Sequence, residues 1–271
     1  MLVEKQQPQW RKRMETIDSV VEAIHLPDAV VDQDQEWCEA IIDGDKRRFR
    51  FHDYHHVYEV PGLYEGLFYE KLKCCSPTRV VSLLADMLRD FGGSAERMRV
   101  LDVGAGNGMV GDELAARGAP FLAGVDIIAE ARDAAQRDRP GLYDEYHVVD
   151  LTDLGERDEE RLRGYSLNCL TSVAALGYGD IPPAAFVKAL DLIETPGWVA
   201  FTIKEDFLHE EDSTGFSRLI RKLSRDRILQ MQAYRRYRHR LSISGEPLYY
   251  VAMVASKERD LPDSLLESDF A

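Results

Sequence analysis

The sequence lacks any long apolar run. None approaches the roughly 18 consecutive apolar residues that a membrane-crossing helix needs, although 45% of the 271 residues are hydrophobic. Charged side chains occur throughout the first 24 residues, which is not typical of a secretory leader. We therefore expect a cytoplasmic protein with no membrane partner, long enough for one domain with an extension.

Cysteine is scarce and badly spaced for metal binding. The four cysteines are Cys38, Cys74, Cys75 and Cys169. No Cys-x-x-Cys pair occurs, and His52, His55 and His56 have no nearby cysteine and only Asp53 as a carboxylate at ligand spacing. We expect free thiols in a reducing compartment and no metal site.

Basic residues are outnumbered by acidic ones. The chain has 34 Lys and Arg against 48 Asp and Glu, a formal net charge of −14. A protein that binds duplex nucleic acid gains most of its affinity from phosphate contacts, which require a basic face. We therefore expect no nucleic-acid partner, although the overall balance does not exclude a local basic patch.

Short β-rich runs alternate with helical patterns in the middle of the chain. The expected strands are 99–103, 121–126, 146–149, 167–171 and 198–203, and the expected helices are 108–117, 128–138 and one from Pro182-Pro183 to Ile193. This alternation predicts a parallel sheet with helices on both faces. Two final β-rich runs, 228–241 and 248–256, leave no room for a helix between them and should form an antiparallel hairpin.

The N-terminal part is expected to be a largely helical extension. Apolar residues at helical spacing mark residues 8–24, and Asp43-Gly44-Asp45 is a turn whose flanks could pair as a hairpin. Ser76-Pro77 begins a helix that ends at Gly92-Gly93. The predicted organisation is therefore a helical extension at 1–93, an α/β domain at 94–257 and a flexible tail at 258–271.

The most informative motif lies between the first strand and helix of the α/β domain. It reads Val-Leu-Asp-Val-Gly-Ala-Gly-Asn-Gly over residues 100–108. Alternate glycines allow a tight turn and close approach of a ligand to the backbone, and N–H groups at a helix start can bind an anion. The dinucleotide fingerprint G-x-G-x-x-G fits less well, because the third glycine is one residue early and Met109 stands in its place. Asp126, 22 residues after Gly104, ends the second strand and could accept hydrogen bonds from both hydroxyls of a ribose.

This segment resembles motif I of the class I S-adenosylmethionine-dependent methyltransferases, an acid followed by G-x-G-x-G. Residues 99–257 resemble the domain of that family, including the terminal hairpin. The resemblance implies a Rossmann-like, mostly parallel seven-stranded sheet with a terminal antiparallel β-hairpin, helices on both faces and an N-terminal helical lid. It also implies S-adenosyl-L-methionine as cofactor and S-adenosyl-L-homocysteine as product.

The resemblance further implies roles for individual residues. Those at the methionine end of the cofactor would be Asp102, Gly104, Ala105 and Gly106, with Thr171 and Ser172 bordering the methyl group. Those at the nucleoside would be Asp126 on the ribose, Ile127 on the adenine, and Asp150 and Leu151 on the adenine amino group and ring. Tyr64 would close over the cofactor from the lid. Two alternatives stay open: Tyr64 as an ordinary core or surface tyrosine, and Asp150 as a helix cap.

The methyl acceptor is less well specified. Residues 172–182 are similar to small-molecule members of the family, and the Asn/Asp/Ser-Pro-Pro-aromatic motif of many base and amide methylating enzymes is absent after the fourth strand. We therefore expect an oxygen or nitrogen of a small molecule, with His55, His56 and His209 as candidate catalytic bases. The alternatives are a non-catalytic binding or regulatory module, a protein or RNA methyltransferase, and an NAD-dependent oxidoreductase.

One arginine-rich segment needs a separate explanation. In a strand, Tyr234, Arg236, Arg238 and Arg240 would share one face. That face is either a solvated sheet edge or a site for an anionic acceptor. The acceptor's identity, the pathway and the oligomeric state stay open. Because lids exclude water from methyl transfer, removing residues 1–75 should preserve some cofactor affinity and abolish transfer.

Overall fold

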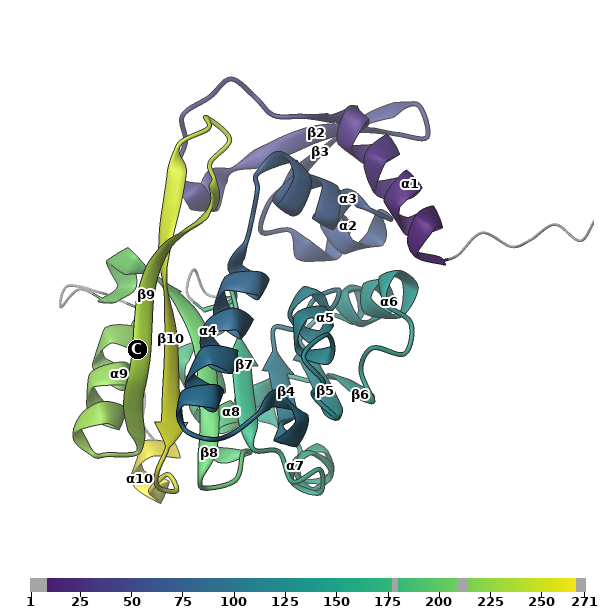
Figure 1. Ribbon diagram of the computed structural model, residues 1–271. Helices are drawn as coiled ribbons and strands as arrows, with labels where there is room; N and C mark the ends of the chain where they lie inside the picture. Colours follow the sequence, from purple (N-terminus) through teal and green to yellow (C-terminus); the bar gives the residue numbers. More distant parts are fainter. Residues whose placement is uncertain (1–8, 177–179, 209–213, 267–271) are drawn as a thin grey trace, which may run out of the picture. The chain divides into compact units, whose positions relative to one another are not determined.

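The computed structural model describes residues 9–176, 180–208 and 214–266, and the chain forms two compact units (Figure 1). The N-terminal unit contains residues 1–75 and 239–248, and the core unit contains residues 76–238 and 249–271. The division at Ser76 differs from the boundary expected after residue 93. Helix α4 (Ser76–Asp90) belongs to the core unit because its buried face, which includes Val80 and Leu84, packs there against α5 and β8.

A seven-stranded sheet forms the core unit. Its strands are β4 (Arg99–Val103), β5 (Phe121–Asp126), β6 (Glu145–Val148), β7 (Cys169–Ser172), β8 (Gly197–Lys204), β9 (Leu229–Leu241) and β10 (Pro247–Lys257). They lie in the order β6-β5-β4-β7-β8-β10-β9. The first five are mutually parallel, and β10 runs antiparallel to β8. The predicted mostly parallel sheet with a terminal antiparallel hairpin is confirmed.

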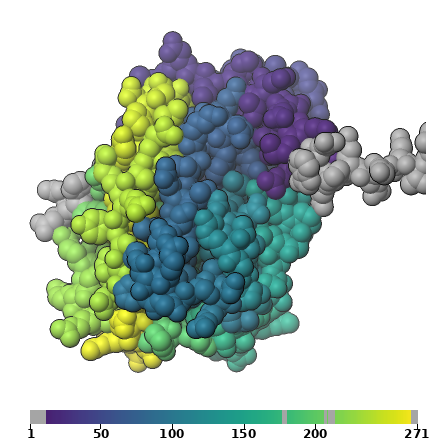
Figure 2. Space-filling view, viewed as in Figure 1, coloured from purple at the N-terminus to yellow at the C-terminus, as the bar shows by residue number. Residues whose placement is uncertain are grey.

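Helices cover both faces of this sheet. They are α4, α5 (Met109–Ala115), α6 (Ala129–Asp138), α7 (Glu156–Arg163), α8 (Pro183–Asp191), α9 (Phe216–Arg225) and α10 (Asp263–Leu266). Helices α4, α5 and α6 lie on one face, and α8 and α9 lie on the other (Figure 1). In the space-filling view, side chains of α4 and α5 cover the sheet while those of β9 stay exposed beside them (Figure 2).

The main hydrophobic core lies between the sheet and helices α8 and α9. Leu101 and Val103 of β4 point into it together with Phe186, Phe201 and Phe216. Successive side chains of a strand point to opposite faces. Asp102, between Leu101 and Val103, therefore points toward the face that carries α4, α5 and α6.

Residues 258–266 pack against the core unit, which corrects the prediction of a flexible tail for this part of the segment 258–271. Leu261 and Leu265 are buried in the main core, and α10 packs against α8. Leu261 precedes α10 and Leu265 lies within it, and burial of both side chains holds the segment against the core. Residues 267–271 lie outside the described part of the chain.

The N-terminal unit contains both helices and a sheet. Its elements are α1 (Gln9–Ala23), β1 (Ile24–His25), β2 (Trp37–Ile42), β3 (Asp45–Arg50), α2 (Tyr54–Glu59) and α3 (Leu63–Glu65), followed by a π-helical turn at Gly66–Lys71. Strands β2 and β3 pair around Asp43 and Gly44, which both have positive φ, as a tight hairpin requires. The hairpin is confirmed, and β1 adds a third strand to it, so the extension predicted to be largely helical also contains a small sheet.

The tip of the β9–β10 hairpin is part of the N-terminal unit. Arg240 donates to Glu36 Oε2 at 2.5 Å, and the backbone N–H of Ile243 donates to Glu36 Oε1 at 2.7 Å. The N–H of Leu241 donates to the carbonyl of Leu72 at 2.7 Å. Glu36 is fully buried and Arg240 is 3% exposed. This unit is therefore assembled from two segments that lie far apart in the sequence.

Within the described ranges, none of the helices combines the length and the apolar character that crossing a membrane requires.

Candidate functional site

The candidate site lies where the strand order reverses, at the carboxyl ends of β4 and β7. In open α/β sheets this switch point is where ligands bind. Asp102 pairs with Thr171 across β4 and β7, and Asp126 ends the neighbouring β5. The fold therefore places four of the predicted residues (Asp102, Asp126, Thr171 and Ser172) at adjacent strand ends.

The glycine loop after β4 has the backbone geometry that its sequence requires. Gly104, Gly106 and Gly108 have φ values of +70°, +54° and +92°, a region that side chains disfavour. A Cβ on Gly104 would lie 2.7 Å from the Cβ of Ala175 and 3.0 Å from Cδ1 of Ile181. The segment after β7 therefore lies directly on this loop, and no larger residue fits at position 104.

The N–H groups of the loop are bonded to β5. Those of Gly104 and Ala105 donate to the carbonyl of Val125 at 2.9 and 3.1 Å, and that of Gly106 donates to Asp126 Oδ2 at 3.0 Å. These three donors are therefore occupied within the protein. The loop can still offer carbonyl oxygens and a close backbone surface, which suits an ammonium group better than an anion.

Asp126 presents a fixed carboxylate at the end of β5. Its two oxygens accept N–H groups from Gly106 at 3.0 Å and Ile128 at 3.3 Å. Burial raises the pKa of Asp126, and these main-chain hydrogen bonds oppose that rise. Each carboxylate oxygen can accept a further hydrogen bond, so a pair of hydroxyls fits here. Ile127 is 59% exposed beside it, an apolar surface next to the acid.

Asp102 is buried beneath the glycine loop. It is 1% exposed, and its oxygens accept hydrogen bonds from the hydroxyls of Tyr143 and Thr171, each at 2.7 Å. Burial raises the pKa of this carboxyl to about 6, while the two hydrogen bonds act to lower it. Thr171, which the resemblance assigned to the methyl group, therefore uses its hydroxyl to hold Asp102.

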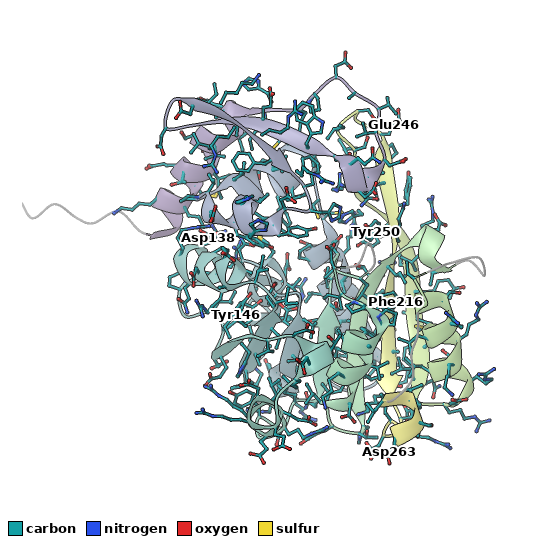
Figure 3. The ribbon with its side chains drawn as sticks, turned by 180° about the vertical axis from the view of Figure 1, so that it is seen from behind. Asp138, Tyr146, Phe216, Glu246, Tyr250 and Asp263 are labelled. Carbon is teal, nitrogen blue, oxygen red and sulfur yellow. The ribbon has the colours of Figure 1, made fainter. Side chains whose placement is uncertain are left out.

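Sequence reasoning missed two tyrosines that fix the loop. Tyr143 binds Asp102, and Tyr146 (labelled in Figure 3) donates to the carbonyl of Gly106 at 2.8 Å. Two glycines inside regular elements could have revealed them. A Cβ on Gly124 of β5 would lie 2.9 Å from the Tyr146 ring, and one on Gly111 of α5 would lie 2.9 Å from the Tyr143 ring. A lone glycine within a strand often marks such a close approach.

Arg139 also supports the glycine loop from outside. It is 6% exposed, donates to the carbonyl of Asn107 at 3.0 Å and pairs with Asp112 of α5 at 3.1 Å. An arginine can make several such bonds because its guanidinium carries five N–H donors. The loop is therefore fixed on both sides before any ligand arrives.

The end of β7 holds a buried hydroxyl. Ser172 is fully buried, and its Oγ has no hydrogen-bond partner among the residues that the structure describes. Two residues on, the N–H of Ala174 donates to Thr202 Oγ1 at 2.7 Å, with Ala174 at a φ of +58°. Buried polar groups are usually satisfied, so Ser172 is the predicted residue here with spare hydrogen-bonding capacity.

The two predicted adenine residues after β6 have structural partners. Asp150 Oδ1 accepts the N–H of Thr152 at 2.8 Å and its hydroxyl at 2.7 Å, which caps the short turn at Leu151–Asp153. Leu151 is 5% exposed and packs in the main core. The capping alternative for Asp150 is therefore observed, and the residue is exposed.

Three candidate residues, Tyr64, His55 and His56, lie in the N-terminal unit. Tyr64 packs in an aromatic cluster, with ring centroids 4.7 Å from Tyr58 and 5.0 Å from Phe68. His55 and His56 are exposed at the start of α2, where their rings lie 4.0 Å apart. All three belong to the N-terminal unit, whereas the glycine loop belongs to the core unit. His209 lies outside the described residues.

The arginine-rich face is divided between the two units. Arg236 pairs with Glu205 at 2.8 Å and lies over the Tyr249 ring at 3.7 Å, whereas Arg240 is buried with Glu36 in the N-terminal unit. Tyr234 is 75% exposed. Tyr234, Arg236 and Arg238 are therefore exposed on the core-unit part of β9, whereas Arg240 is buried and is not part of that face.

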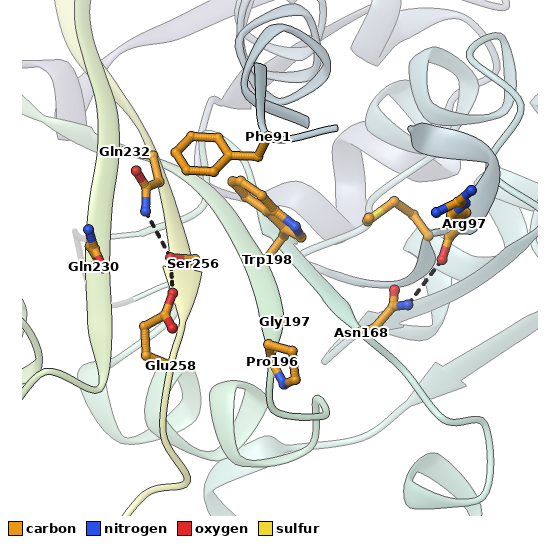
Figure 4. A pocket seen from close by; sticks show the side chains of 11 residues that line it. Phe91, Arg97, Asn168, Pro196, Gly197, Trp198, Gln230, Gln232, Ser256 and Glu258 are labelled. Atoms are coloured by element: carbon orange, nitrogen blue, oxygen red, sulfur yellow. Dashed lines mark hydrogen bonds between the residues drawn. The ribbon is translucent and has the colours of Figure 1, made fainter. Parts of the chain in front are cut away.

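A separate pocket of about 360 Å³ lies at the opposite edge of the sheet, by the amino ends of β7, β8 and β9 and the carboxyl end of β10 (Figure 4). Phe91 and Trp198 form one wall with ring centroids 5.6 Å apart. Its polar side chains bind each other: Gln232 donates to Ser256 at 2.9 Å, and Ser256 donates to Glu258 at 2.5 Å. This pocket is distinct from the site at the strand carboxyl ends.

No group of three His, Cys, Asp or Glu side chains in the described part of the chain is arranged to hold a metal ion. All four cysteines are free thiols.

Comparison with known proteins agrees with this geometry. A family model described as a methyltransferase domain matches residues 77–246, more than half of the chain. A ubiquinone biosynthesis O-methyltransferase from Neisseria meningitidis serogroup C (strain 053442) is 31% identical over 109 residues. That match covers 38% of this chain and 43% of the relative, so it spans less than half of the relative's length.

Two solved structures share the fold. The N-methyltransferase NodS from Bradyrhizobium japonicum WM9, in complex with S-adenosyl-L-homocysteine, superposes with a TM-score of 0.53 at 13% identity. The alignment covers 77% of this chain and 98% of NodS. A candidate RNA methyltransferase from Pyrococcus horikoshii gives a TM-score of 0.50 at 17% identity and covers 69% of this chain and 88% of its own.

Proposed function

This chain belongs to the methyltransferase-domain family and is a class I S-adenosylmethionine-dependent methyltransferase, and from that premise we propose that it methylates an oxygen or nitrogen atom of a small molecule. The observation that carries the cofactor assignment is the Asp126 carboxylate, which two main-chain N–H groups hold at the strand end beside the glycine loop. S-adenosylmethionine supplies a methyl group that its sulfonium has already activated.

The residues at the strand ends fit this cofactor. Asp126 has acceptor capacity left for the two ribose hydroxyls, and the exposed Ile127 offers an apolar surface for the adenine. The Gly104–Gly106 loop offers carbonyl oxygens near the buried Asp102, a combination that suits the positive end of a methionine. Asp150 can add a hydrogen bond to the adenine amino group while it caps its turn.

Two observations support a small acceptor. The ubiquinone relative acts on a small molecule by its name, and it matches this chain over 109 residues. The net charge of −14 disfavours a polyanionic acceptor such as RNA, because phosphate contacts need basic side chains. Fold alone does not choose the acceptor. We further propose that the N-terminal unit is the lid, with Tyr64 closing over the cofactor, and that His55, His56 or His209 accepts the acceptor's proton.

The test measures where the methyl group goes. Protein and radiolabelled S-adenosylmethionine are incubated with separate metabolite, RNA and protein fractions of a cell extract. We expect label in the metabolite fraction, and loss of transfer and of S-adenosylhomocysteine binding in Asp126→Ala. A carboxylate that accepts charged hydrogen bonds contributes about 1.5–3 kcal/mol per bond, so affinity should fall at least about tenfold. Asp133→Ala, an exposed acid on α6, is the matched control and should keep both.

Other outcomes point elsewhere. Label in RNA or protein would overturn the small-acceptor assignment and leave the cofactor site intact. Binding of S-adenosylhomocysteine without transfer to any fraction would favour the non-catalytic binding module.

A further inference from the structure

We infer that Tyr143 is a positioning residue for the methyl donor: together with Thr171, it keeps the buried Asp102 carboxylate charged and oriented toward the ammonium group of the methionine end. This inference rests on the proposed cofactor site. Tyr143 lies in the connection between α6 and β6, outside the glycine motif.

The position of Tyr143 is set by glycines. A Cβ on Gly108 would lie 3.2 Å from its ring, and one on Gly111 would lie 2.9 Å from its hydroxyl oxygen. From this place the hydroxyl donates to Asp102 Oδ2 at 2.7 Å. A hydroxyl that donates to a carboxylate favours the charged form of the acid. The packing that holds the Tyr143 ring therefore favours the ionised form of Asp102.

Asp102 has hydroxyl partners in place of a cation. Its other oxygen accepts from Thr171 Oγ1 at 2.7 Å, and no lysine or arginine in the described ranges forms an ion pair with it. A buried carboxylate without a cation is costly. Two hydroxyls lower this cost without neutralising the charge, so the negative charge stays available for a positively charged ligand.

The other groups around Asp102 limit what else titrates there. Asp126 on β5 opposes ionisation of Asp102 by its own negative charge. Burial raises the pKa of Cys169 on β7 to about 12 and raises that of Tyr146 still further, so both stay neutral near pH 7. Arg139 remains positive and acts on the tyrosine side of the cluster. Asp102, whose pKa burial raises to about 6, is therefore expected to change charge between pH 5 and 8.

Tyr146 provides a matched comparison. It also ends in a hydroxyl, and its ring lies edge to face with that of Tyr143 at 5.3 Å. Its hydroxyl donates at 2.8 Å to the Gly106 carbonyl and not to a carboxylate. The same Tyr→Phe change at the two positions therefore removes one hydrogen bond to a charge and one to a neutral group.

The experiment measures S-adenosylhomocysteine affinity by calorimetry from pH 5 to 8 for the wild type, Tyr143→Phe, Thr171→Val and Tyr146→Phe. Wild-type affinity should rise as Asp102 ionises around pH 6. Loss of a hydroxyl donor raises the pKa of the acid, so the Tyr143→Phe and Thr171→Val profiles should move upward by about 0.5–1 pH unit. Their affinity should fall about two- to fivefold at pH 6, as the ionised fraction of Asp102 does, and approach the wild-type value at pH 8. Tyr146→Phe should weaken binding by one constant factor at every pH.

A second measurement separates this inference from the proposed function. The Asp102 carboxyl carbon can be titrated by NMR in the ligand-free protein, and the same upward shift is expected in Tyr143→Phe alone of the two tyrosine variants. An unshifted titration, or a Tyr143→Phe affinity profile parallel to that of Tyr146→Phe, would overturn the role of Tyr143. Absence of S-adenosylhomocysteine binding by the wild type, with the titration shifted, would overturn the cofactor site instead.

Discussion

At the scale of single residues, the charged form of the buried Asp102 should lower the stability of the ligand-free fold while it favours binding of the cofactor. Its pKa is raised from 3.8 to about 6, so the folded protein holds this proton more tightly than the unfolded chain does. The stabilising contribution is complete below pH 4 and is lost as the pH rises from about 4 to about 6. We predict that ligand-free Asp102→Asn gains on the order of 1–3 kcal/mol over the wild type across that range.

Urea unfolding at pH 4, 5, 6 and 7 measures this difference. The control is Asp133→Asn, an exposed carboxylate in an ion pair with Arg132 on α6. It should track the wild type at all four pH values. A stability difference between Asp102→Asn and the wild type that stays constant with pH would show that the Asp102 charge is not the cause.

Site residues could be predicted from the sequence where the local backbone geometry requires a particular residue type. Alternate glycines and an acid at the next strand end are visible in the sequence, and the structure places Gly104 and Asp126 at the neighbouring strand ends where the sequence predicted them. Tyr143 and Tyr146 were missed because their partners lie 41 and 40 residues away in the sequence. The only trace of them is indirect, in glycines that leave room for their rings.

At the scale of elements, the tip of the β9–β10 hairpin depends on one buried ion pair. Arg240 is 3% exposed and Glu36 fully buried, and Glu36 also accepts the N–H of Ile243. Removing the arginine would leave a buried carboxylate without its cation, which typically costs about 3–5 kcal/mol. We predict that Arg240→Met destabilises the N-terminal unit by about this amount.

Limited proteolysis and chemical denaturation measure this loss. Arg235→Met, an exposed arginine of the same strand, is the matched control and should change stability by less than about 0.5 kcal/mol. In the double variant Glu36→Gln with Arg240→Met, the buried charge is gone and much of the loss should be recovered. If Arg240→Met is as stable as Arg235→Met, the pair does not hold the tip.

The predicted bounds of an element match the observed ones closely where a single hydrophobic pattern dominates its sequence. The strands 99–103 and 121–126 were predicted with the bounds of β4 and β5, because buried parallel strands appear as short continuous apolar runs. The prediction of a flexible tail was wrong for residues 258–266. Leu261 and Leu265 lie in a segment of mixed polarity, and the sequence does not show that the core buries both of them. Helix α4 was identified but assigned to the wrong unit, since a pattern shows which face is apolar and not what covers it.

At the scale of the whole molecule, the N-terminal unit could not be delimited from the sequence. Residues 239–248 belong to it, and the ion pair that fixes them joins positions separated by 204 residues. Local patterns carry no record of such a pairing. The β9–β10 hairpin was predicted, but nothing in its alternation indicates that its tip leaves the core unit.

This discontinuous assembly changes how the proposed lid has to be removed. Deleting residues 1–75 alone removes the partners of the hairpin tip. Arg240 loses its ion pair with Glu36, and the N–H of Leu241 loses the carbonyl of Leu72. The side chain of Ile243, buried in the full chain, becomes exposed. Such a chain should aggregate, and its inactivity would say nothing about a lid.

A cleaner variant also replaces residues 239–248 by an Asp-Gly turn, which suits a two-residue hairpin. We predict that it folds and binds S-adenosylhomocysteine with some loss of affinity, yet transfers no methyl group, because nothing then excludes water from the strand ends. Circular dichroism, calorimetry and the label assay measure the three properties on one preparation. Methyl transfer at the wild-type rate by this trimmed core would mean that the N-terminal unit is not a lid and that the catalytic groups all lie within residues 76–238 and 249–271.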